Sequence, residues 1–295
     1  MQEIYEGKSK GMLVNHFIKA SKNDNPSSVV ETTDEYLAAV VNNFFKNVDF
    51  ESKELYHSSF LIDKVTDYVF LLNTAEGQEQ QQKLYKKSIS KVMEKVSGDK
   101  TVKKDISEFL ITRFTNSRNS EIVDWLFADY YNTLPESLQD AEFKKDKVAL
   151  LQATVGRTAP DFSWKEGESA YKLSTLSDSD TYLLVFWSTG CSHCLEEIPL
   201  LHKYMKKHNN TSVIAFGIEQ EAPEWVEYVK QLDGWHNVMG THPDNKWDNE
   251  TVQTYQLVGT PTYFVLNSNK QIVAMPNSFD DVKTYFENPN KVAKN

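Results

Sequence analysis

The feature that most constrains this chain is a pair of cysteines two residues apart, directly after a short apolar run. Residues 187–194 read WSTGCSHC, and residues 182–186 before them read YLLVF. A short continuous apolar run predicts a buried central strand. The apolar residues that follow recur at helical spacing: Leu195, Ile198, Leu201 and Met205. The sequence therefore predicts a strand that delivers Cys191 to the N-terminus of a helix.

This placement favours redox chemistry of the two thiols. Free backbone N–H groups and the positive end of the helix dipole stabilise a thiolate at a helix N-terminus. Cys194 lies one turn further on the same face, so the pair can close and open a disulfide. We expect Cys191 to be the nucleophile and Cys194 the resolving thiol. The alternatives are two small buried apolar residues, or half of a zinc site whose second ligand pair is missing from the sequence.

Together with LEEIP at residues 195–199, this arrangement resembles thioredoxin-fold proteins of the exported TlpA and ResA type. Three further segments carry the resemblance in the same order along the chain. GRTAPDFS at 156–163 is similar to the opening segment of redoxins and peroxiredoxins, and VGTPT at 258–262 is similar to the cis-proline loop. A hairpin of residues 262–266 against 271–275, with a short helix after it, completes the set. The resemblance implies an α/β thioredoxin-like domain over residues 153–295, with a central mixed sheet flanked by helices.

The resemblance also implies a substrate-binding loop. It places Thr260 and Pro261 against the cysteines through a cis peptide bond, with Thr260 presenting its backbone to a substrate chain. Gly259 is expected to give this turn its conformational freedom. We also count Trp187 among the residues near the substrate, either in the core or in the wall beside the active site.

Two further residues are expected to act in catalysis with Cys191 and Cys194. His193 lies between the cysteines, where a cation or a hydrogen bond would stabilise the Cys191 thiolate and make the disulfide more oxidising. The alternative is a solvated loop histidine. Glu197 matches the acidic position that ResA-type proteins place near the second cysteine, where a carboxyl would shuttle the Cys194 proton. The alternative for Glu197 is a solvent-facing helix carboxylate. Gly190 stands where many relatives carry a bulky residue, which implies a more open rim.

Residues 32–152 are predicted to form an all-α domain, preceded by a loose lead-in segment at residues 1–31. TTDE at 32–35 is a helix capping box. Apolar stripes at helical spacing, separated by turn signals, follow at 36–48, 61–72, 85–96, 102–114 and 122–131. This half resembles the helical region that precedes thioredoxin domains in exported proteins of Bacteroidetes. Residues 1–152 contain no cysteine and only two histidines, His16 and His57, so we expect a scaffold or a docking surface.

Composition excludes several classes of function. A formal charge of −10 without a long basic run argues against nucleic acid as a partner. The longest uninterrupted apolar run, residues 182–187, is too short to cross a bilayer, which takes about 20 residues. The N-terminal MQEI lacks the basic and apolar regions of a signal peptide, so the chain either starts in the cytoplasm or has had its leader removed. The resemblance to exported relatives favours the periplasm or the cell envelope.

The function that we expect is thiol-disulfide oxidoreduction. The resemblance implies an enzyme that reduces or exchanges disulfides of exported proteins, is itself reduced by a membrane-linked thiol reductant, and needs no cofactor. The oligomeric state stays open. One alternative is a non-enzymatic, redox-sensing binding module that docks through the helical domain. A peroxidase is the other, although the strand leads to Cys-x-x-Cys instead of the Pro-x-x-x-Thr-x-x-Cys loop that peroxiredoxins use.

Overall fold

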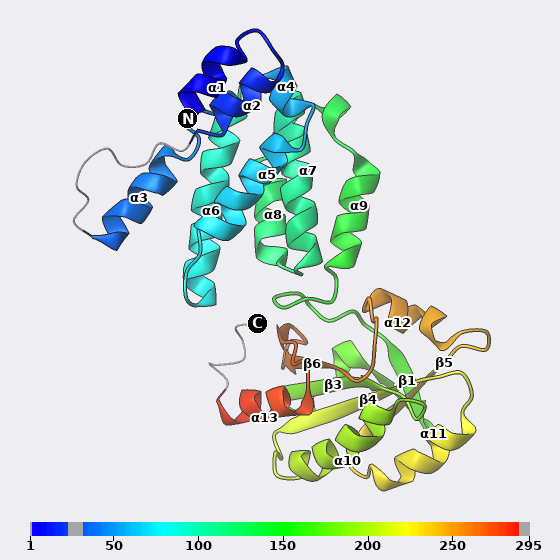
Figure 1. The fold of residues 1–295 in the computed structure, drawn as a ribbon. Coiled ribbons are helices and arrows are strands. Elements are labelled where there is room, and N and C mark those ends of the chain that lie inside the picture. The colour runs from blue at the N-terminus through cyan, green and yellow to red at the C-terminus, as the bar shows by residue number, and fades with distance from the viewer. Residues whose placement is uncertain (1, 23–31, 289–295) are drawn as a thin grey trace. The chain divides into compact units, whose positions relative to one another are not determined.

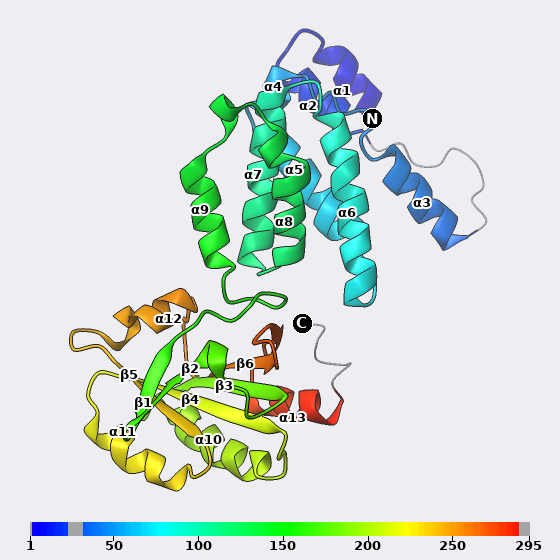
Figure 2. The ribbon, with the colours of Figure 1, turned by 180° about the vertical axis from the view of Figure 1, so that it is seen from behind.

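The computed structural model describes residues 2–22 and 32–288, and the chain divides into two compact units (Figures 1 and 2). The first unit comprises Met1–Asn116 and Ile122–Asp140, and the second comprises Ser117–Glu121 and Ala141–Asn295. In the two described ranges, no helix is both long enough and apolar enough to cross a bilayer.

The first unit is helical, as predicted. Its helices are α1 (Gln2–Lys8), α2 (Val14–Ala20), α3 (Thr33–Asn43), α4 (Lys53–Tyr56), α5 (Phe60–Thr66), α6 (Gln78–Lys95), α7 (Lys100–Asn116) and α8 (Ser120–Asp129). A π-helical segment, Asp67–Leu72, continues α5, and 3₁₀ turns lie at Tyr131–Thr133 and Glu136–Leu138. Residues of the predicted stripes form its core: Val65, Val69, Ile89, Val92, Leu110 and Ile122 are completely buried. Burial of these apolar stripes is what holds short helices in place.

Helix α3 begins at the predicted capping box but does not bury the predicted face. The Glu35 N–H donates to Thr32 Oγ1 at 3.2 Å, and the Thr32 N–H donates to Glu35 Oε2 at 3.3 Å. The helix then ends at Asn43 and buries none of its own residues. Phe45 and Val48 are buried from the turn that follows. The apolar residues predicted as one helical stripe at 36–48 therefore extend beyond the end of α3, and they do not form a single helical face.

Two helices, α1 and α2, stand where the sequence predicts a loose lead-in. The Asn15 side-chain amide donates to the Glu6 carbonyl at 2.8 Å and to Ser9 Oγ at 2.9 Å, and it thereby joins the two helices. Asn15 and Ser9 are buried. Since polar side chains make this contact, a search for apolar stripes does not detect it. Residues 23–31 of the same segment lie outside the described residues.

The second unit has a five-stranded mixed sheet at its centre, in the order β5-β4-β3-β6-β7. Strands β3 (Thr181–Trp187), β4 (Thr211–Glu219) and β5 (His236–Thr241) are parallel, whereas β6 (Thr262–Asn267) pairs antiparallel with β3 and with β7 (Ile272–Ala274). Strands β1 (Ser163–Glu166) and β2 (Ser169–Lys172) form a separate antiparallel pair. The helices are α9 (Ala141–Leu150), α10 (Ser192–Met205), α11 (Pro223–Tyr228), α12 (Glu250–Thr254) and α13 (Phe279–Glu287). The predicted fold class, an all-α part followed by an α/β part with a mixed sheet, is confirmed.

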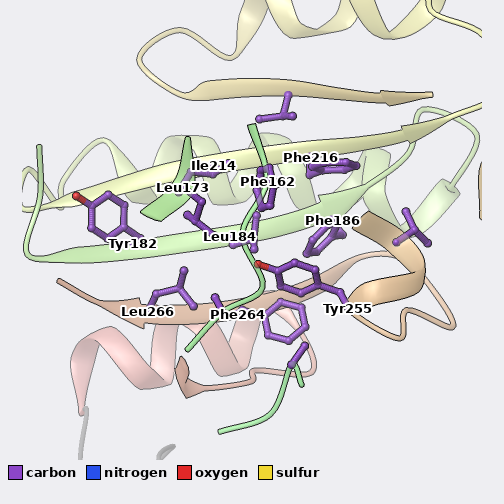
Figure 3. Close-up of a cluster of buried hydrophobic side chains, with 14 of the residues drawn as sticks. Phe162, Leu173, Tyr182, Leu184, Phe186, Ile214, Phe216, Tyr255, Phe264 and Leu266 are labelled. Carbon is purple, nitrogen blue, oxygen red and sulfur yellow. The ribbon is translucent and has the colours of Figure 1, made fainter. Parts of the chain in front are cut away.

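Alternate residues of β3 point to opposite faces of the sheet, and each set is buried in a different core. Both faces of the sheet are therefore covered. Leu183, Val185 and Trp187 pack with residues of α10, α11 and α13. Tyr182, Leu184 and Phe186 enter the second core, which Figure 3 shows with Phe162 and Tyr255. The Tyr255 hydroxyl donates to the Pro160 carbonyl at 2.6 Å and so ties the opening segment to the sheet. Burial on both faces explains why β3 reads as a continuous apolar run.

Three strands, and the ends of two helices, differ from the sequence prediction. Strand β5 and the β1–β2 pair were not predicted. Strand β5 lies at the sheet edge and has two buried positions, while β1 and β2 are four residues long and have one buried position between them. The helix predicted from Pro223 to about residue 232 ends at Tyr228 and continues as a 3₁₀ turn, Val229–Gln231. The helix predicted for residues 248–255 is α12, preceded by the 3₁₀ turn Lys246–Asp248.

We expect the substitution Gly217→Ala to destabilise the second unit. A Cβ atom at Gly217 in β4 would lie 2.1 Å from Trp225 Nε1, and this indole is buried. Overpacking of a core costs about 1–3 kcal/mol. Gly259→Ala is the matched control, because a Cβ there meets no atom within 4 Å and φ is not in the left-handed region. Urea unfolding measures both, and equal stability of the two variants would contradict the packing argument.

Candidate active site

Strand β3 and helix α10 place Cys191 at the start of the helix. The strand ends at Trp187 and the helix begins at Ser192, so that Cys191 is the N-cap residue. Its backbone is extended, with φ −108° and ψ 114°, and its sulfur accepts the Cys194 N–H at 3.2 Å. A thiol sulfur thus takes the place that a serine or aspartate oxygen usually takes at a helix N-cap. When Cys191 ionises, the negative charge on its sulfur lies at the positive end of the helix dipole, which stabilises it.

The loop that precedes β6 contacts the same sulfur. The Cys191 thiol donates to the Thr260 carbonyl at 3.2 Å, although the two residues are 69 positions apart. The peptide bond between Thr260 and Pro261 is cis. Gly259 does not have a positive φ, so the turn does not use the conformational freedom expected of a glycine there. The structure therefore brings Cys191, Cys194 and Thr260 together, with Gly259 and Pro261 beside them in the chain.

The two cysteines, both reduced, have opposite environments. Cys194 is completely buried, and burial together with the neighbouring Cys191 raises its pKa to about 12. Burial also opposes ionisation of Cys191, which is partly exposed. Hydrogen bonds from the Cys194 thiol and from the backbone N–H groups of Cys194 and His193 outweigh this effect, so the pKa of Cys191 lies below its ordinary value. Cys191 is therefore the thiol that ionises first.

His193 contributes to this balance through its backbone. Its N–H group favours the Cys191 thiolate, whereas its side chain is exposed. The role predicted for the imidazole, as a cation beside the thiolate, stays a prediction.

Glu197 is held by a buried tyrosine. The Tyr263 hydroxyl donates to Glu197 Oε2 at 2.6 Å, and the Phe279 N–H donates to the same oxygen at 3.1 Å. Tyr263 is completely buried and belongs to the apolar cluster that contains Cys194. Burial and then Glu197 raise the pKa of Tyr263, and negative charge on either cysteine raises it further. Glu197 is half-buried and linked to this cluster, whereas its neighbour Glu196 is exposed.

Trp187 belongs to the buried apolar cluster that contains Cys194. Its side chain is completely buried, and its ring centroid lies 5.1 Å from that of Tyr228. In the reduced protein it does not reach the surface on which a substrate would lie. Val258, which precedes Gly259 and which we did not predict as a site residue, is in contrast 95% exposed.

Sequence reasoning missed four polar residues that support the site: Ser188, Thr189, Glu219 and Lys246. They hold the loop between β3 and Cys191 through side-chain hydrogen bonds. The position of Glu219 offered a signal, because it ends a strand that is parallel to β3. Carboxyl ends of parallel strands meet at one edge of a sheet, where sites are commonly built.

Residues 178–272 match a family model described as thioredoxin-like. The chain contains a thioredoxin-like domain. This finding confirms the resemblance inferred from the sequence, and it accords with a redox type of function. No curated protein matches the chain significantly.

Solved structures extend the comparison of the fold. A thioredoxin-like protein from Bacteroides caccae is 18% identical, with a TM-score of 0.56, and the match covers 90% of this chain and 98% of that one. The thioredoxin domain of a thiol-disulfide oxidoreductase from Bacteroides vulgatus is 22% identical over 45% of this chain and 96% of its own, with a TM-score of 0.39. A thiol:disulfide interchange protein from Bacteroides sp. is 17% identical over 48% and 95%, with a TM-score of 0.37. The match to the Bacteroides caccae protein extends over residues of both units of this chain.

We expect iodoacetamide to modify Cys191 well below the pH at which a free thiol reacts, and to leave Cys194 unmodified. The hydrogen bonds at the helix N-terminus favour the Cys191 thiolate, while burial keeps Cys194 protonated. Mass spectrometry of the reduced protein after alkylation across a pH series measures both sites. Equal labelling of the two cysteines at neutral pH would contradict this assignment.

We expect Tyr263→Phe to lower the free energy of unfolding by about 1–3 kcal/mol, because a buried hydrogen bond to a charged acceptor is lost. Tyr171→Phe is the control, since the Tyr171 side chain is half-buried and stacks on Trp164. Urea unfolding of the reduced protein compares the two variants. A Tyr263→Phe protein as stable as the control would show that the bond to Glu197 does not stabilise the fold.

Proposed function

We propose that this protein is a thiol-disulfide oxidoreductase that reduces or exchanges disulfides of other proteins through a mixed disulfide at Cys191. The asymmetry of the two thiols carries the proposal. Cys191 is partly exposed and has a lowered pKa, whereas Cys194 is buried and has a raised pKa. An accessible nucleophile beside a protected second thiol is the arrangement that two-step disulfide exchange requires.

The first step is attack by the Cys191 thiolate on one sulfur of a substrate disulfide. A mixed disulfide forms, and the other substrate sulfur leaves as a thiolate. Cys194 then loses its proton and attacks Cys191 Sγ, which releases the second substrate sulfur. The substrate gains two electrons and, after protonation of both thiolates, two protons. The protein is left with a Cys191–Cys194 disulfide, which an external dithiol must reduce before the next cycle.

Resolution requires that the buried Cys194 becomes easier to ionise once the mixed disulfide has formed. In the reduced protein, Cys191 contributes to the raised pKa of Cys194. A Cys191 sulfur bound in a disulfide carries no negative charge, so its contribution to the raised pKa of Cys194 is lost in the mixed disulfide. Glu197, linked to the buried cluster by Tyr263, is the base that we assign to the Cys194 proton.

The loop that precedes β6 is the proposed substrate contact. The Thr260 carbonyl accepts from the Cys191 thiol in the reduced state, and it becomes available to a substrate N–H when that proton is lost. Pro261 and Gly259 lie beside it in the loop. Val258, two residues away from Thr260, offers an almost fully exposed apolar side chain to the incoming polypeptide. Backbone pairing with one apolar contact suits many unrelated protein substrates.

Partners and location follow from the proposed chemistry and from the likeness to exported relatives. We place the protein in the periplasm or cell envelope, where exported proteins carry disulfides. Its substrates would be disulfide-containing proteins, and a membrane-linked thiol reductant would restore the dithiol. The dithiol suffices for the reaction without a cofactor. The net charge of −10 disfavours nucleic acid as a partner.

We expect the reduced protein to accelerate insulin reduction by dithiothreitol, and Cys191→Ser to abolish the effect. Cys194→Ser, reduced and then mixed with insulin after dithiothreitol has been removed, should accumulate the mixed disulfide, because it lacks the resolving thiol. Glu197→Gln should slow resolution, while Glu196→Gln, which alters an exposed carboxylate one position away, should not. Turbidity and non-reducing electrophoresis measure the two steps.

The same assay separates the proposed function from its rivals. A wild-type protein that oxidises and reduces reversibly but never reduces insulin would favour the redox-sensing binding module. Consumption of hydrogen peroxide at the expense of the dithiol, with no insulin reduction, would favour a peroxidase.

A further inference from the structure

A buried carboxylate lies behind the loop that carries Cys191, and disulfide exchange does not use it. Glu219 ends strand β4 and is only 5% exposed. Glu219 Oε1 accepts the Thr189 N–H at 2.6 Å and the Thr189 hydroxyl at 3.1 Å, and Oε2 accepts the Ser188 hydroxyl at 3.2 Å. All three donors belong to the two residues that follow β3. A buried charge is costly to a fold unless hydrogen bonds or an opposite charge compensate it.

The Ser188 hydroxyl connects this carboxylate to a lysine. Ser188 Oγ donates to Glu219 and accepts from Lys246 Nζ at 2.8 Å and from the Gly190 N–H at 3.2 Å. A hydroxyl has one donor and two acceptor sites, so Ser188 uses its full capacity. Lys246 brings positive charge to the buried carboxylate through this one oxygen. Lys246 is the first residue of the 3₁₀ turn Lys246–Asp248.

The same loop determines where the Cys191 sulfur lies. The Cys191 N–H donates to the Ser188 carbonyl at 3.2 Å, and the Gly190 N–H is bound to Ser188 Oγ. The hydrogen bonds that lower the pKa of Cys191 come from the side chains of Cys194 and Thr260 and from the backbone N–H groups of Cys194 and His193. Such bonds weaken steeply when the geometry changes. If this loop were mobile, Cys191 Sγ would occupy several positions, and in many of them its hydrogen bonds would be longer and less well aligned.

We propose that Glu219, Ser188 and Lys246 form a positioning clamp that fixes Cys191 at the helix N-terminus and thereby maintains its reactivity. These three are positioning residues, since they act on the sulfur through the loop. The proposal rests on the proposed function only in taking Cys191 as the nucleophile.

The direction of the effect separates positioning from simple electrostatics. Replacing Glu219 by glutamine removes a negative charge, and electrostatics alone would then lower the pKa of Cys191. Loss of positioning has the opposite sign, because the sulfur loses hydrogen bonds that favour the thiolate. Glutamine also turns one acceptor into a donor, which the saturated Ser188 hydroxyl cannot accommodate without releasing Lys246 or Gly190.

The test is the pH dependence of iodoacetamide alkylation at Cys191 in the full chain. In Glu219→Gln and in Ser188→Ala, we expect the midpoint of the curve of alkylation rate against pH to move to higher pH. The alkylation rate at pH 7 should fall roughly threefold or more, which corresponds to a rise of about half a unit in the pKa of Cys191. Ser188→Ala changes no charge and removes one oxygen, so it carries the test if Glu219→Gln does not fold. Glu221→Gln, which alters an exposed carboxylate in the next segment, should leave the midpoint unchanged.

Two outcomes would overturn the clamp. One is a midpoint that stays or moves to lower pH in folded Glu219→Gln. The other is a wild-type midpoint in Ser188→Ala. The double variant should show a smaller shift than the sum of the single shifts, because both residues act through one hydrogen-bond network. Alkylation does not require turnover, so failure of the proposed function would show separately as a wild-type protein that does not reduce insulin.

Discussion

The proposed chemistry of this protein depends on one sulfur at a helix N-cap. Cys191 Sγ accepts the Cys194 N–H and donates to the Thr260 carbonyl, each at 3.2 Å. Cys194 is three residues away in the chain, whereas Thr260 is 69 positions away and is brought to the sulfur by the sheet. Because Phe186 of β3 pairs with Thr262 of β6, the end of one strand and the start of the other meet beside the sulfur. The register of two antiparallel strands thus determines which carbonyl faces the nucleophile.

Two carboxylates are joined by hydrogen bonds to residues near this sulfur and its partner thiol, and one of these bonds comes from a backbone N–H. Glu197 is linked to the cluster around Cys194 by the Tyr263 hydroxyl, and Glu219 is linked to the Cys191 loop by Ser188 and Thr189. An anion in direct contact with either sulfur would oppose the thiolate that the proposed reaction needs. An intervening hydroxyl keeps the hydrogen-bonding capacity of the carboxylate near the site while it separates the charges.

How much the sequence predicted depends on how local each feature is. Strand β3, the start of α10 and the capping box of α3 follow from adjacent residues, and the family resemblance supplied the loop at Thr260. The pairs Ser188–Lys246 and Glu197–Tyr263 join positions 58 and 66 residues apart, and no local pattern marks them. Helices α1 and α2 were missed for a related reason, since buried polar side chains join them. Apolar periodicity detects cores, whereas polar networks become visible only when the fold places their members together.

Gly190 and Lys246 illustrate how a departure from the family pattern is compensated in space. The missing side chain at Gly190 implied an open rim beside Cys191. A Cβ built at Gly190 would lie 3.8 Å from Lys246 Nζ and 3.7 Å from Ser188 Oγ, which are ordinary contacts that admit a small side chain. A tryptophan at this position would extend well beyond its Cβ and compete with the lysine for the same space. The glycine and the segment that carries Lys246 are therefore two parts of one arrangement, because the absence of a larger side chain at position 190 leaves room for the bond from Lys246 Nζ to Ser188 Oγ.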